Sequence, residues 1–477
     1  MTSEPRRLHV AAVLAGALNQ LRGLIVPIVI AALIGGRGGG ESLTRGLLYT
    51  AIGALATTGI AGLRWWTTRW WIDDSLHLRA GVLSETITSV PLERVQAVDS
   101  VYGPIQRLFG VVELHIQSAG GGRKAEIVLS AVTAAEADEV REAVRQAGGE
   151  GRDEEPAVAE ARPEWRLERR SLLAAAATSG SLGVLVPVVA AASQMGQNLF
   201  GAQAAEKLVP SGAGQVIRDL LLVIAAAWLL SFAGTLAAFA GFRLERDGER
   251  LRIRRGILER RDASVPVARV QALRVVEGPL REPFGLAQVR IDTAGYANEP
   301  ATAQTLIPLA RRSELPALVA SFLPEFTAEI DALERLPRRA ARRYALPLAL
   351  PGLVAALATA IVLGPAWLLL LVVAAAGAGL GLARHRAAGW RLDGAHIVVR
   401  NRRLARTTAI ADASRLQHVD VAVNPLQRRA RLATLGLAIG SGRRFQLRHL
   451  GDTTAADLFG VLGRRALGSD AAEADLG

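Results

Sequence analysis

The sequence predicts a membrane protein in which three pairs of α-helical transmembrane segments alternate with three α+β domains. The first observation is a set of six long apolar stretches in a chain that is nevertheless 21% charged. The second is a short motif that occurs three times, each time behind a pair of these stretches. The third is a run of alternating apolar and polar residues after each motif, followed by an amphipathic helical pattern. Each soluble unit is therefore expected to be a set of antiparallel strands closed by a C-terminal helix.

The six apolar stretches set the expected domain boundaries, because a membrane-spanning helix needs about 20 mainly apolar residues. The stretches cover residues 10–34, 46–63, 171–192, 220–241, 345–363 and 366–383. The expected order is a transmembrane pair at 8–63, a domain at 70–149, a linker at 150–165, a pair at 171–241, a domain at 242–326, a pair at 345–383, a domain at 389–467 and a disordered tail at 468–477. Because each pair crosses and returns, all three domains are expected on the side of the N-terminus.

Basic residues at the ends of the stretches predict which side this is, because cytoplasmic loops carry an excess of Arg and Lys. The expected soluble side carries Arg6, Arg7, Arg64, Arg69, Arg166, Arg169, Arg170, Arg338, Arg339, Arg342, Arg343, Arg384 and Arg386. The other side carries only Arg37, Arg45, Lys207 and Arg218. The sequence therefore predicts a multi-pass protein of the plasma membrane, with a retained first span and with the N-terminus and the domains in the cytoplasm.

The first apolar stretch has polar residues near its middle, namely Asn19, Gln20 and Arg22. Either they form a polar site inside the helix bundle, or the first half of the stretch lies in the interface and Arg22 extends to the headgroups. Four tryptophans, Trp65, Trp66, Trp70 and Trp71, follow the second stretch. Their position is typical of the aromatic belt at a membrane exit.

Composition excludes some classes of site. The net charge of +12 fits an anionic membrane surface or nucleic acid, and the apolar stretches favour the membrane, so no nucleic-acid partner is expected. The absence of cysteine excludes disulfides, thiolate zinc sites and a cysteine nucleophile. The histidines lack the spacing of metal ligands, and no nucleophile–base pair or phosphate loop stands out. No catalytic, metal-binding or cofactor-binding residue is therefore expected.

The repeated motif begins with Arg-Val-Gln or Arg-Leu-Gln and continues to a proline ten residues after the arginine. Its framework residues are Arg94, Gln96, Pro104 and Gly110 in copy one, Arg269, Gln271, Pro279 and Gly285 in copy two, and Arg415, Gln417 and Pro425 in copy three. We call Arg94, Arg269 and Arg415 the box arginines. They are expected to donate hydrogen bonds to backbone carbonyls at a bend, while the glutamines satisfy a strand edge. The proline segment is expected to be a turn, and copy three has Ala430-Arg431 where the others have Phe-Gly.

Alternation after the proline predicts half-buried strands. The inward residues are expected to be Val112, Leu114 and Ile116 in copy one, Ala287, Val289 and Ile291 in copy two, and Ala433, Leu435 and Leu437 in copy three. In copy two, Gln288, Arg290 and Asp292 are expected to face outward. The closing helices are expected at 134–147, 312–322 and 454–466. Before each box the pattern predicts a hairpin, with Gly81, Gly256 or Asn401-Arg402 at its turn.

These boxes, in this order and behind apolar pairs, resemble the bacterial pleckstrin-homology-like (PH-like) domains of the YdbS/YdbT type, and the resemblance covers nearly the whole chain. It implies a bent antiparallel sandwich or barrel capped by a C-terminal helix. It also implies an association with envelope stress and antimicrobial resistance, without a defined molecular activity.

Arginines surround the first hairpin of the later copies and are the candidate binding residues. They are Arg252, Arg254, Arg255 and Arg260 in copy two, and Arg400, Arg402 and Arg403 in copy three. One interpretation is contact with anionic lipid, worth about 1 kcal/mol for each close cation. The other is topology-determining charge without a ligand. Copy one lacks the cluster.

Three hypotheses for function follow. The first is a non-enzymatic membrane scaffold whose domains bind membrane lipid and a partner protein or a second copy. The second is a component of a transporter or exporter for a lipid or an antimicrobial compound, suggested by the polar residues of the first span. The third, a membrane enzyme, has the least support in the sequence.

Overall fold

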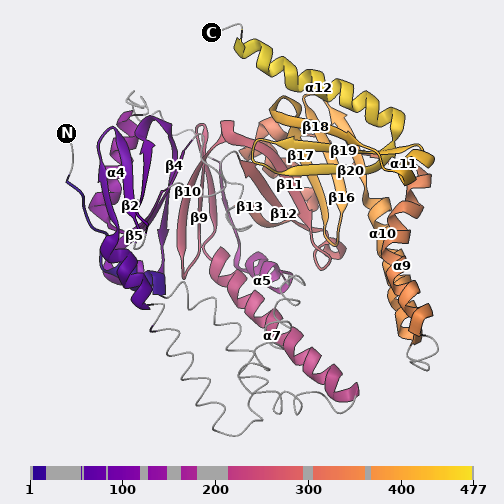
Figure 1. The fold of residues 1–477 in the computed structure, drawn as a ribbon, viewed down its shortest axis with the longest axis horizontal. Coiled ribbons are helices and arrows are strands. Elements are labelled where there is room, and N and C mark those ends of the chain that lie inside the picture. Colours follow the sequence, from indigo (N-terminus) through magenta and orange to yellow (C-terminus); the bar gives the residue numbers. More distant parts are fainter. Residues whose placement is uncertain are drawn as a thin grey trace. The chain divides into compact units, whose positions relative to one another are not determined.

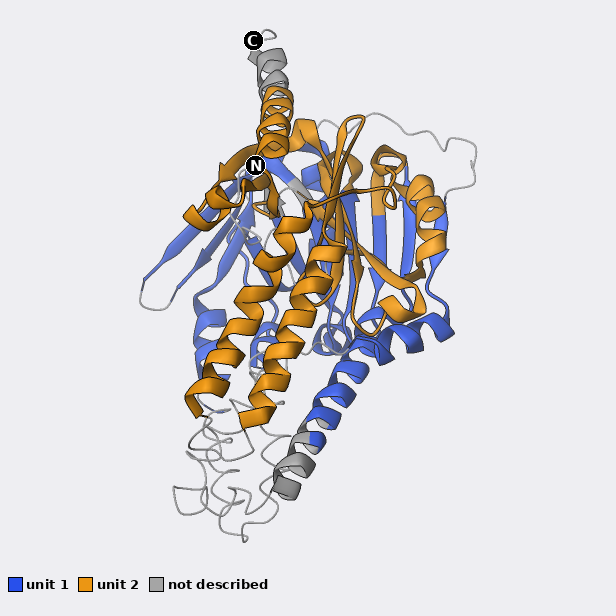
Figure 2. Cartoon of the chain, turned by 90° about the vertical axis from the view of Figure 1, so that its right-hand side faces the viewer, with its two compact units in different colours: residues 1–247, 252–265 blue, residues 248–251, 266–477 orange. Residues whose placement is uncertain are grey.

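The computed structural model describes residues 4–17, 55, 58–81, 84–118, 127–147, 163–179, 213–293, 304–359 and 367–474. The chain forms two compact units. One contains residues 1–247 and 252–265, and the other contains residues 248–251 and 266–477 (Figure 2). The boundary between them passes through the second copy of the repeat, so the units do not coincide with the repeats. Asn19, Gln20 and Arg22 lie outside the described residues.

The first unit contains copy one and most of the first three strands of copy two (Figure 1). Its elements, with β9 and β10 at the boundary, are β1 Arg69–Ile72, β2 Ser75–Ala80, β3 Thr86–Pro91, η1 Leu92–Arg94, β4 Val95–Tyr102, α3 Pro104–Phe109, β5 Val111–Ser118, β6 Ile127–Thr133, α4 Ala134–Ala147, β7 Glu164–Arg166, α5 Arg169–Ala177, α7 Ala213–Phe239, β8 Arg243–Asp247, β9 Arg250–Arg255 and β10 Arg260–Pro266. They form a three-stranded sheet, β1-β2-β3, and a seven-stranded sheet, β6-β5-β4-β10-β9-β8-β7.

The second unit contains the rest of copy two and all of copy three. Its elements are η2 Val267–Arg269, β11 Val270–Glu277, η3 Glu282–Phe284, β12 Leu286–Thr293, β13 Thr305–Arg311, η4 Arg312–Glu314, α8 Leu315–Phe322, η5 Pro324–Phe326, β14 Glu334–Arg335, η6 Arg338–Ala340, α9 Ala341–Thr359, α10 Trp367–Ala387, β15 Gly389–Asp393, β16 His396–Arg402, β17 Arg406–Asp412, η8 Ala413–Arg415, β18 Leu416–Ala422, α11 Pro425–Arg429, β19 Leu432–Ile439, β20 Arg444–Gly451 and α12 Asp452–Ala474. They form sheets β13-β12-β11-β17-β16-β15-β14 and β18-β19-β20.

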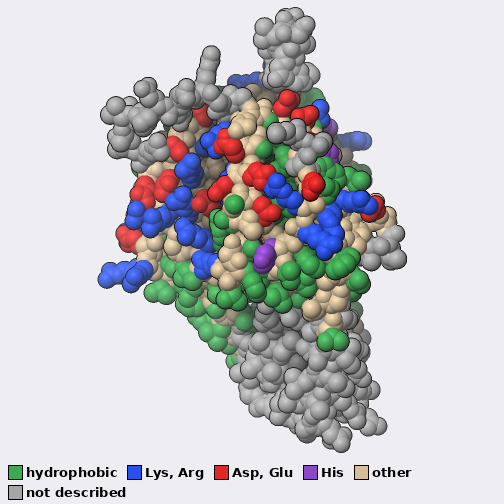
Figure 3. Space-filling view, turned by 90° about the vertical axis from the view of Figure 1, so that its left-hand side faces the viewer, with side chains coloured by type: hydrophobic (Ala, Val, Ile, Leu, Met, Phe, Trp, Pro, Cys, Tyr) green, Lys and Arg blue, Asp and Glu red, His purple; other side chains and the backbone are tan. Residues whose placement is uncertain are grey.

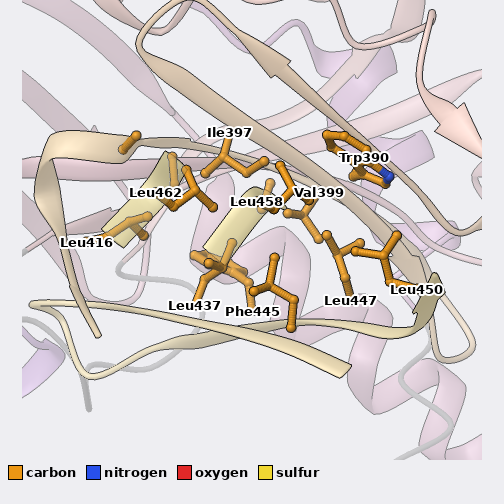
Figure 4. Close-up of a cluster of buried hydrophobic side chains, with 14 of the residues drawn as sticks. Trp390, Ile397, Val399, Leu416, Leu437, Phe445, Leu447, Leu450, Leu458 and Leu462 are labelled. Carbon is orange, nitrogen blue, oxygen red and sulfur yellow. The ribbon is translucent and has the colours of Figure 1, made fainter. Parts of the chain in front are cut away.

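Copy three is built from antiparallel strands of two sheets and a closing helix, which enclose a common apolar core (Figure 4). Leu435 and Leu437 of β19 are buried, as the alternation predicts, because successive strand residues point to opposite faces. Leu458 and Leu462 stand one helical turn apart on α12 and pack into the same cluster. Burial of each leucine is worth about 1.5–3 kcal/mol, so the closing helix is held mainly by this apolar face.

The outward face predicted for copy two is wrong in part. Ala287, Val289 and Ile291 are buried as expected, but Gln288 and Asp292 are buried as well. Asp292 accepts hydrogen bonds from Arg274 at 2.6 and 2.7 Å. Both faces of β12 are therefore covered. Alternation of apolar and polar residues in the sequence cannot predict this, because the residues buried on the second face are polar.

The helices near the apolar stretches are described only in part. Among the described residues, α10 is the one helix long and apolar enough to cross a membrane, so six spans are not confirmed. The helix α9 packs against α10 through glycine, since a Cβ added at Gly352 would lie 2.9 Å from the backbone nitrogen of Ala374. Small residues that let two helix backbones approach closely are typical of helix pairs in membranes. Hydrophobic side chains also gather below the charged ones on one face of the molecule (Figure 3).

The segments that flank each helical region are hydrogen-bonded to each other. Arg6 forms an isolated bridge with Trp70, β7 pairs with β8, and β14 pairs with β15. Each helical region therefore begins and ends at neighbouring strands. The paired strands β7 and β14 are short, and their residues carried no period-two signal.

Two other expectations need correction. Trp70 lies in β1 with 0% of its surface exposed, so it belongs to the protein core rather than to an aromatic belt. Trp66 is exposed, and the guanidinium of Arg7 lies 4.8 Å from its ring centre. The helix α12 runs to Ala474, through most of the range expected to be disordered.

Candidate anion site at a junction of two repeats

Neighbouring repeats are joined by strand pairing, and both junctions use one register. The box strand β4 of copy one pairs with β10 of copy two, and β11 of copy two pairs with β17 of copy three (Figure 1). Tyr102 faces Arg260 at the first junction and Glu277 faces Arg406 at the second. In both cases the residue eight positions after one box arginine faces the residue nine positions before the next.

The box residues act across the second junction. Arg415 Nη1 donates to the carbonyl oxygens of Ala268, at 2.9 Å, and Val270. The backbone N–H of Ser441 in copy three donates to Gln271 Oε1 of copy two at 2.7 Å. The carbonyls that Arg415 binds thus belong to the preceding copy. The repeated box is part of the joint between repeats.

The proline segment begins a short helix in copies one and three, α3 and α11, whereas in copy two Pro279 lies in a turn that precedes η3. The expected turn is therefore present in copy two only. Pro104 and Pro425 suit a helix start, because the first helical position needs no backbone N–H. Gly110 and Gly285 end the element with φ of 66° and 62°, and Arg431 takes the same place in copy three with φ of 51°. The missing Phe-Gly is therefore replaced by a non-glycine residue in the left-handed conformation.

The residue two positions after each motif proline is a buried polar side chain that the sequence did not single out. Gln106 donates to Glu113 at 3.2 Å, and Gln427 donates to Thr434 at 2.8 Å. Arg281 takes this position in copy two, and its burial, with the nearby charge of Arg290, lowers its pKa to about 10. These groups support the segment from within and do not face solvent.

At the first junction, arginines line a cavity of about 350 Å³. Its lining residues are Arg107, Gly241, Arg243, Arg254, Arg255, Gly256, Ile257 and Arg260. Five of the eight are arginines and none is acidic. Several guanidinium groups around one cavity suit a phosphate or carboxylate, which they can bind through two donors each.

The hairpin turn of copy two is fixed against the end of α7. The N–H of Gly256 donates to the Ala240 carbonyl at 2.9 Å, and the N–H of Ile257 donates to the Ala237 carbonyl at 3.0 Å. Gly256 has φ of 95° and a Cβ there would overlap the Glu259 carbonyl, so the turn requires glycine. Arg107 of α3 donates to the Ile257 carbonyl at 2.7 Å, which brings copy one to the same turn.

The structure brings together three of the four arginines predicted in copy two. Arg254, Arg255 and Arg260 line the cavity. Arg252 does not, and forms an ion pair with Asp247 at 3.3 Å. Two lining residues were missed: Arg107 and Arg243. Arg107 belongs to another repeat, and only the spatial pairing of repeats could have placed it here.

The arginines of copy three lie in a different environment. Arg402 is ion-paired with Glu282, and Arg400 donates to Thr408 Oγ1 at 2.9 Å and to the Ile330 carbonyl. Arg403 accepts a hydrogen bond on its carbonyl from Arg384 at 2.9 Å. Arg406, at the end of the same hairpin, donates to the buried Glu277 at 2.6 Å. Most guanidinium groups of this cluster are therefore bound by carboxylates or by backbone and hydroxyl oxygens of the protein.

One pair of sequence positions explains the difference. Copy two has Glu277 and Glu282 eight and thirteen residues after its box arginine, and both pair with arginines of copy three. Copy one has Tyr102 and Arg107 at the same positions. The first junction thus lacks both neutralising acids and adds a cation.

Comparison with known proteins agrees with the repeat architecture. Residues 10–148, 185–325 and 346–466 match the family described as bacterial PH domain. The chain is also 28% identical over 486 residues to the UPF0699 transmembrane protein YdbT of Bacillus subtilis (strain 168). The alignment covers 96% of this chain and 97% of the relative. No solved structure matches the chain.

Proposed function

We propose, on the premise that this chain belongs to the bacterial PH domain family, that it is a non-enzymatic scaffold of the plasma membrane that binds anionic lipid. The binding site is the cavity at the first junction. It takes the phosphate of a lipid headgroup, and the remaining domain surface is left for a partner protein. Envelope stress or antimicrobial resistance is the process that we expect this scaffold to serve.

The observation that carries the proposal is the arginine-lined cavity beside the end of α7. The last part of this helix, Ala227–Phe239, is apolar. Arg255 lies with its guanidinium 5.6 Å from the ring centre of Phe239, so the cavity and the apolar helix share a residue contact. A cation cluster at the end of an apolar helix meets the headgroup region if that helix enters the bilayer.

The exposed apolar side chains at the same turn fit this orientation. Ile257 and Leu258 are both largely exposed at the tip of the β9–β10 hairpin. Apolar residues next to a cationic cavity suit a turn that dips into the interface while the arginines bind phosphate.

Pairing of the flanking strands supports a multi-pass arrangement with the domains on one side. A segment that leaves one strand and returns to its neighbour crosses the membrane an even number of times or not at all. The bridge of Arg6 with Trp70 and the pairs β7–β8 and β14–β15 each have this form. The excess of arginine on that side makes it cytoplasmic.

The test is lipid binding by the full chain, because copy two shares its sheets with both neighbours and is not a free-standing domain. The double variant Arg243→Gln, Arg260→Gln removes two exposed cations from the cavity. At about 1 kcal/mol for each cation, affinity for phosphatidylglycerol should fall roughly 30-fold. Lipid retained by the protein in nanodiscs of graded composition, counted by native mass spectrometry, measures this.

The matched control is Arg252→Gln combined with Arg250→Gln, which removes the same charge from β9 outside the cavity lining. If the control and the cavity variant lose lipid equally, the arginines act only through overall charge and the site is rejected. Inorganic phosphate added to the protein in zwitterionic nanodiscs separates a phosphate site from one that needs the whole lipid.

A further inference from the structure

Two strands that correspond to the junction strands, β3 and β18, have no partner strand on their junction edge among the described residues. The strand β3 of copy one corresponds to β10 and β17, which pair with the preceding copy. The strand β18 of copy three corresponds to β4 and β11, which pair with the following copy. Within the described residues, β3 pairs only with β2, and β18 pairs only with β19. An open strand edge presents unpaired N–H and C=O groups that favour the addition of another strand.

We propose that β18 of one chain pairs with β3 of a second copy of this chain, in the register of the two internal junctions. The internal register places Val421 opposite Ile87 and Asp420 opposite Thr88. The same joint that links copies one to two and two to three would then link copy three to copy one of the next chain. This interface does not involve the anion cavity and does not depend on the proposed lipid binding.

The burial of equivalent positions supports this occupant. At the second internal junction, the facing residues at this register position are Val275 and Thr408, which are 3% and 1% exposed. At the first, Ser100 is 5% exposed and faces Asp262, which is half-buried. At the unused edges, Ile87 is 59% exposed and Val421 is 39% exposed. Positions that are buried or half-buried where the joint is made are thus exposed, with apolar side chains, at the two edges where it is not made. A β-branched pair directly opposite each other stabilises an antiparallel joint.

The box residues show the same asymmetry. Arg415 is half-buried because it reaches the carbonyls of the preceding copy, whereas Arg94 is exposed. Gln271 is half-buried against the Ser441 backbone, whereas Gln417 is exposed. A partner strand at both edges would give Arg94 and Gln417 the contacts that their counterparts already make. By analogy with Arg415, Arg94 would donate to the carbonyls of Ser414 and Leu416 in the second copy.

The edges carry few of the features that block strand addition. The strand β3 is Thr-Ile-Thr-Ser-Val-Pro, and β18 is Leu-Gln-His-Val-Asp-Val-Ala. Neither contains lysine or arginine, and the proline stands at the end of β3. Because the two edges differ, the contact is head to tail and builds either a closed ring or a longer chain of subunits.

The absence of cysteine makes a crosslinking test direct. Two chains with different tags, one Ile87→Cys and the other Val421→Cys, are co-expressed and oxidised in native membranes. Facing residues of an antiparallel pair have Cβ atoms about 4.5–5.5 Å apart, close enough for a disulfide after slight adjustment. We expect a mixed dimer from the two variants together and none from either alone. The pair Thr88→Cys with Val421→Cys, one residue out of register, should crosslink far less.

Other outcomes overturn the proposal. If a chain that carries both Ile87→Cys and Val421→Cys forms only an intramolecular disulfide and no mixed dimer, β3 and β18 of the same molecule pair with each other. Dimers of Ile87→Cys with itself indicate a symmetric contact. Equal crosslinking in and out of register indicates random collision, and a crosslink to a different protein alone assigns the edge to another partner.

A second measurement does not depend on disulfide geometry. Val421→Lys places a charge on the β18 edge, and we expect it to weaken self-association of the purified protein roughly tenfold. Phe459→Lys, a matched change at another exposed apolar position on α12, should leave it unchanged. Mass photometry over a concentration series gives both values. Equal self-association of wild type and Val421→Lys would contradict the proposed edge pairing.

Discussion

The two junctions between repeats share one register and differ in charge balance. At the second junction, Glu277 is buried between Arg406 and Arg312, and Glu282 pairs with Arg402. At the first, Tyr102 and Arg107 stand in place of the two acids, and arginines line a cavity instead. The second joint is neutralised by two acids of copy two, whereas the first has no acid at these two positions, and Arg254 of its cavity pairs with Asp262 at 3.0 Å. Duplicated surfaces can therefore separate into a structural joint and a candidate binding site through two substitutions.

The largest expected effect is at the centre of the second junction. Glu277→Gln removes a carboxylate that is 1% exposed and leaves Arg406 and Arg312 without their common partner. Breaking a buried ion pair from one side costs about 3–5 kcal/mol. We expect this loss in the unfolding free energy of the second unit, measured by hydrogen exchange of β11 and β17. Glu282→Gln, whose carboxylate is more exposed, is the control and should cost less.

The next largest effect is expected when the first junction is given an acid of the second. Arg107→Glu places an acid where copy two has Glu282, facing the arginines of the first junction. It changes the local charge by two, so lipid affinity should fall roughly 30-fold at about 1 kcal/mol per charge. The nanodisc measurement described above reports it. Gln in place of Glu at this position should have about half the effect in free energy, and equal losses would contradict a charge mechanism.

A smaller effect concerns the copy that lost its glycine. Arg431 has φ of 51°, a conformation that costs a non-glycine residue about 1–2 kcal/mol. Arg431→Gly should relieve this cost. Glycine loses more chain entropy on folding, which offsets part of the gain, so the net stabilisation of copy three should be up to about 1 kcal/mol. The shift in thermal unfolding of the detergent-solubilised protein measures this. The reverse change, Gly285→Arg, should destabilise copy two, and a neutral result in both would show that the turn is not strained.

The smallest effect is on pH dependence. Burial by itself raises the pKa of Glu277, but the hydrogen bond from Arg406 and the charges of Arg312 and Arg406 outweigh it and hold that pKa below its ordinary value. A carboxyl group with a lowered pKa stabilises the fold above its unfolded pKa, and this contribution is lost as pH falls through the folded pKa. The second unit should thus lose stability below about pH 4.3. Stability–pH curves of Glu277→Gln should lack this part of the acid limb; parallel curves would contradict the assignment.

Prediction from sequence succeeded where the signal is local. The closing helix 134–147 matches α4, and the inward residues of β5, β12 and β19 are buried. The strand–helix order of the PH-like domains is present in all three copies. Prediction failed for Asp292 and Trp70, whose burial depends on distant groups. Three of the cavity arginines were named in advance, but Arg107 was not, because it belongs to another copy.

The sequence by itself determined the number of repeats, the strands and closing helices within them, and the glycines that end the proline segments. These follow from periodicity and backbone conformation, which depend on residues a few positions apart. Only the tertiary structure decided which strand edges meet, because β4 pairs with β10 and β11 with β17 across more than a hundred residues. Backbone N–H and C=O groups are the same in almost every residue, so the sequence does not show which strand edges pair, and the pairing depends on the whole fold. That pairing makes one junction neutral and the other cationic, and it leaves β3 and β18 open at the two ends of the described array.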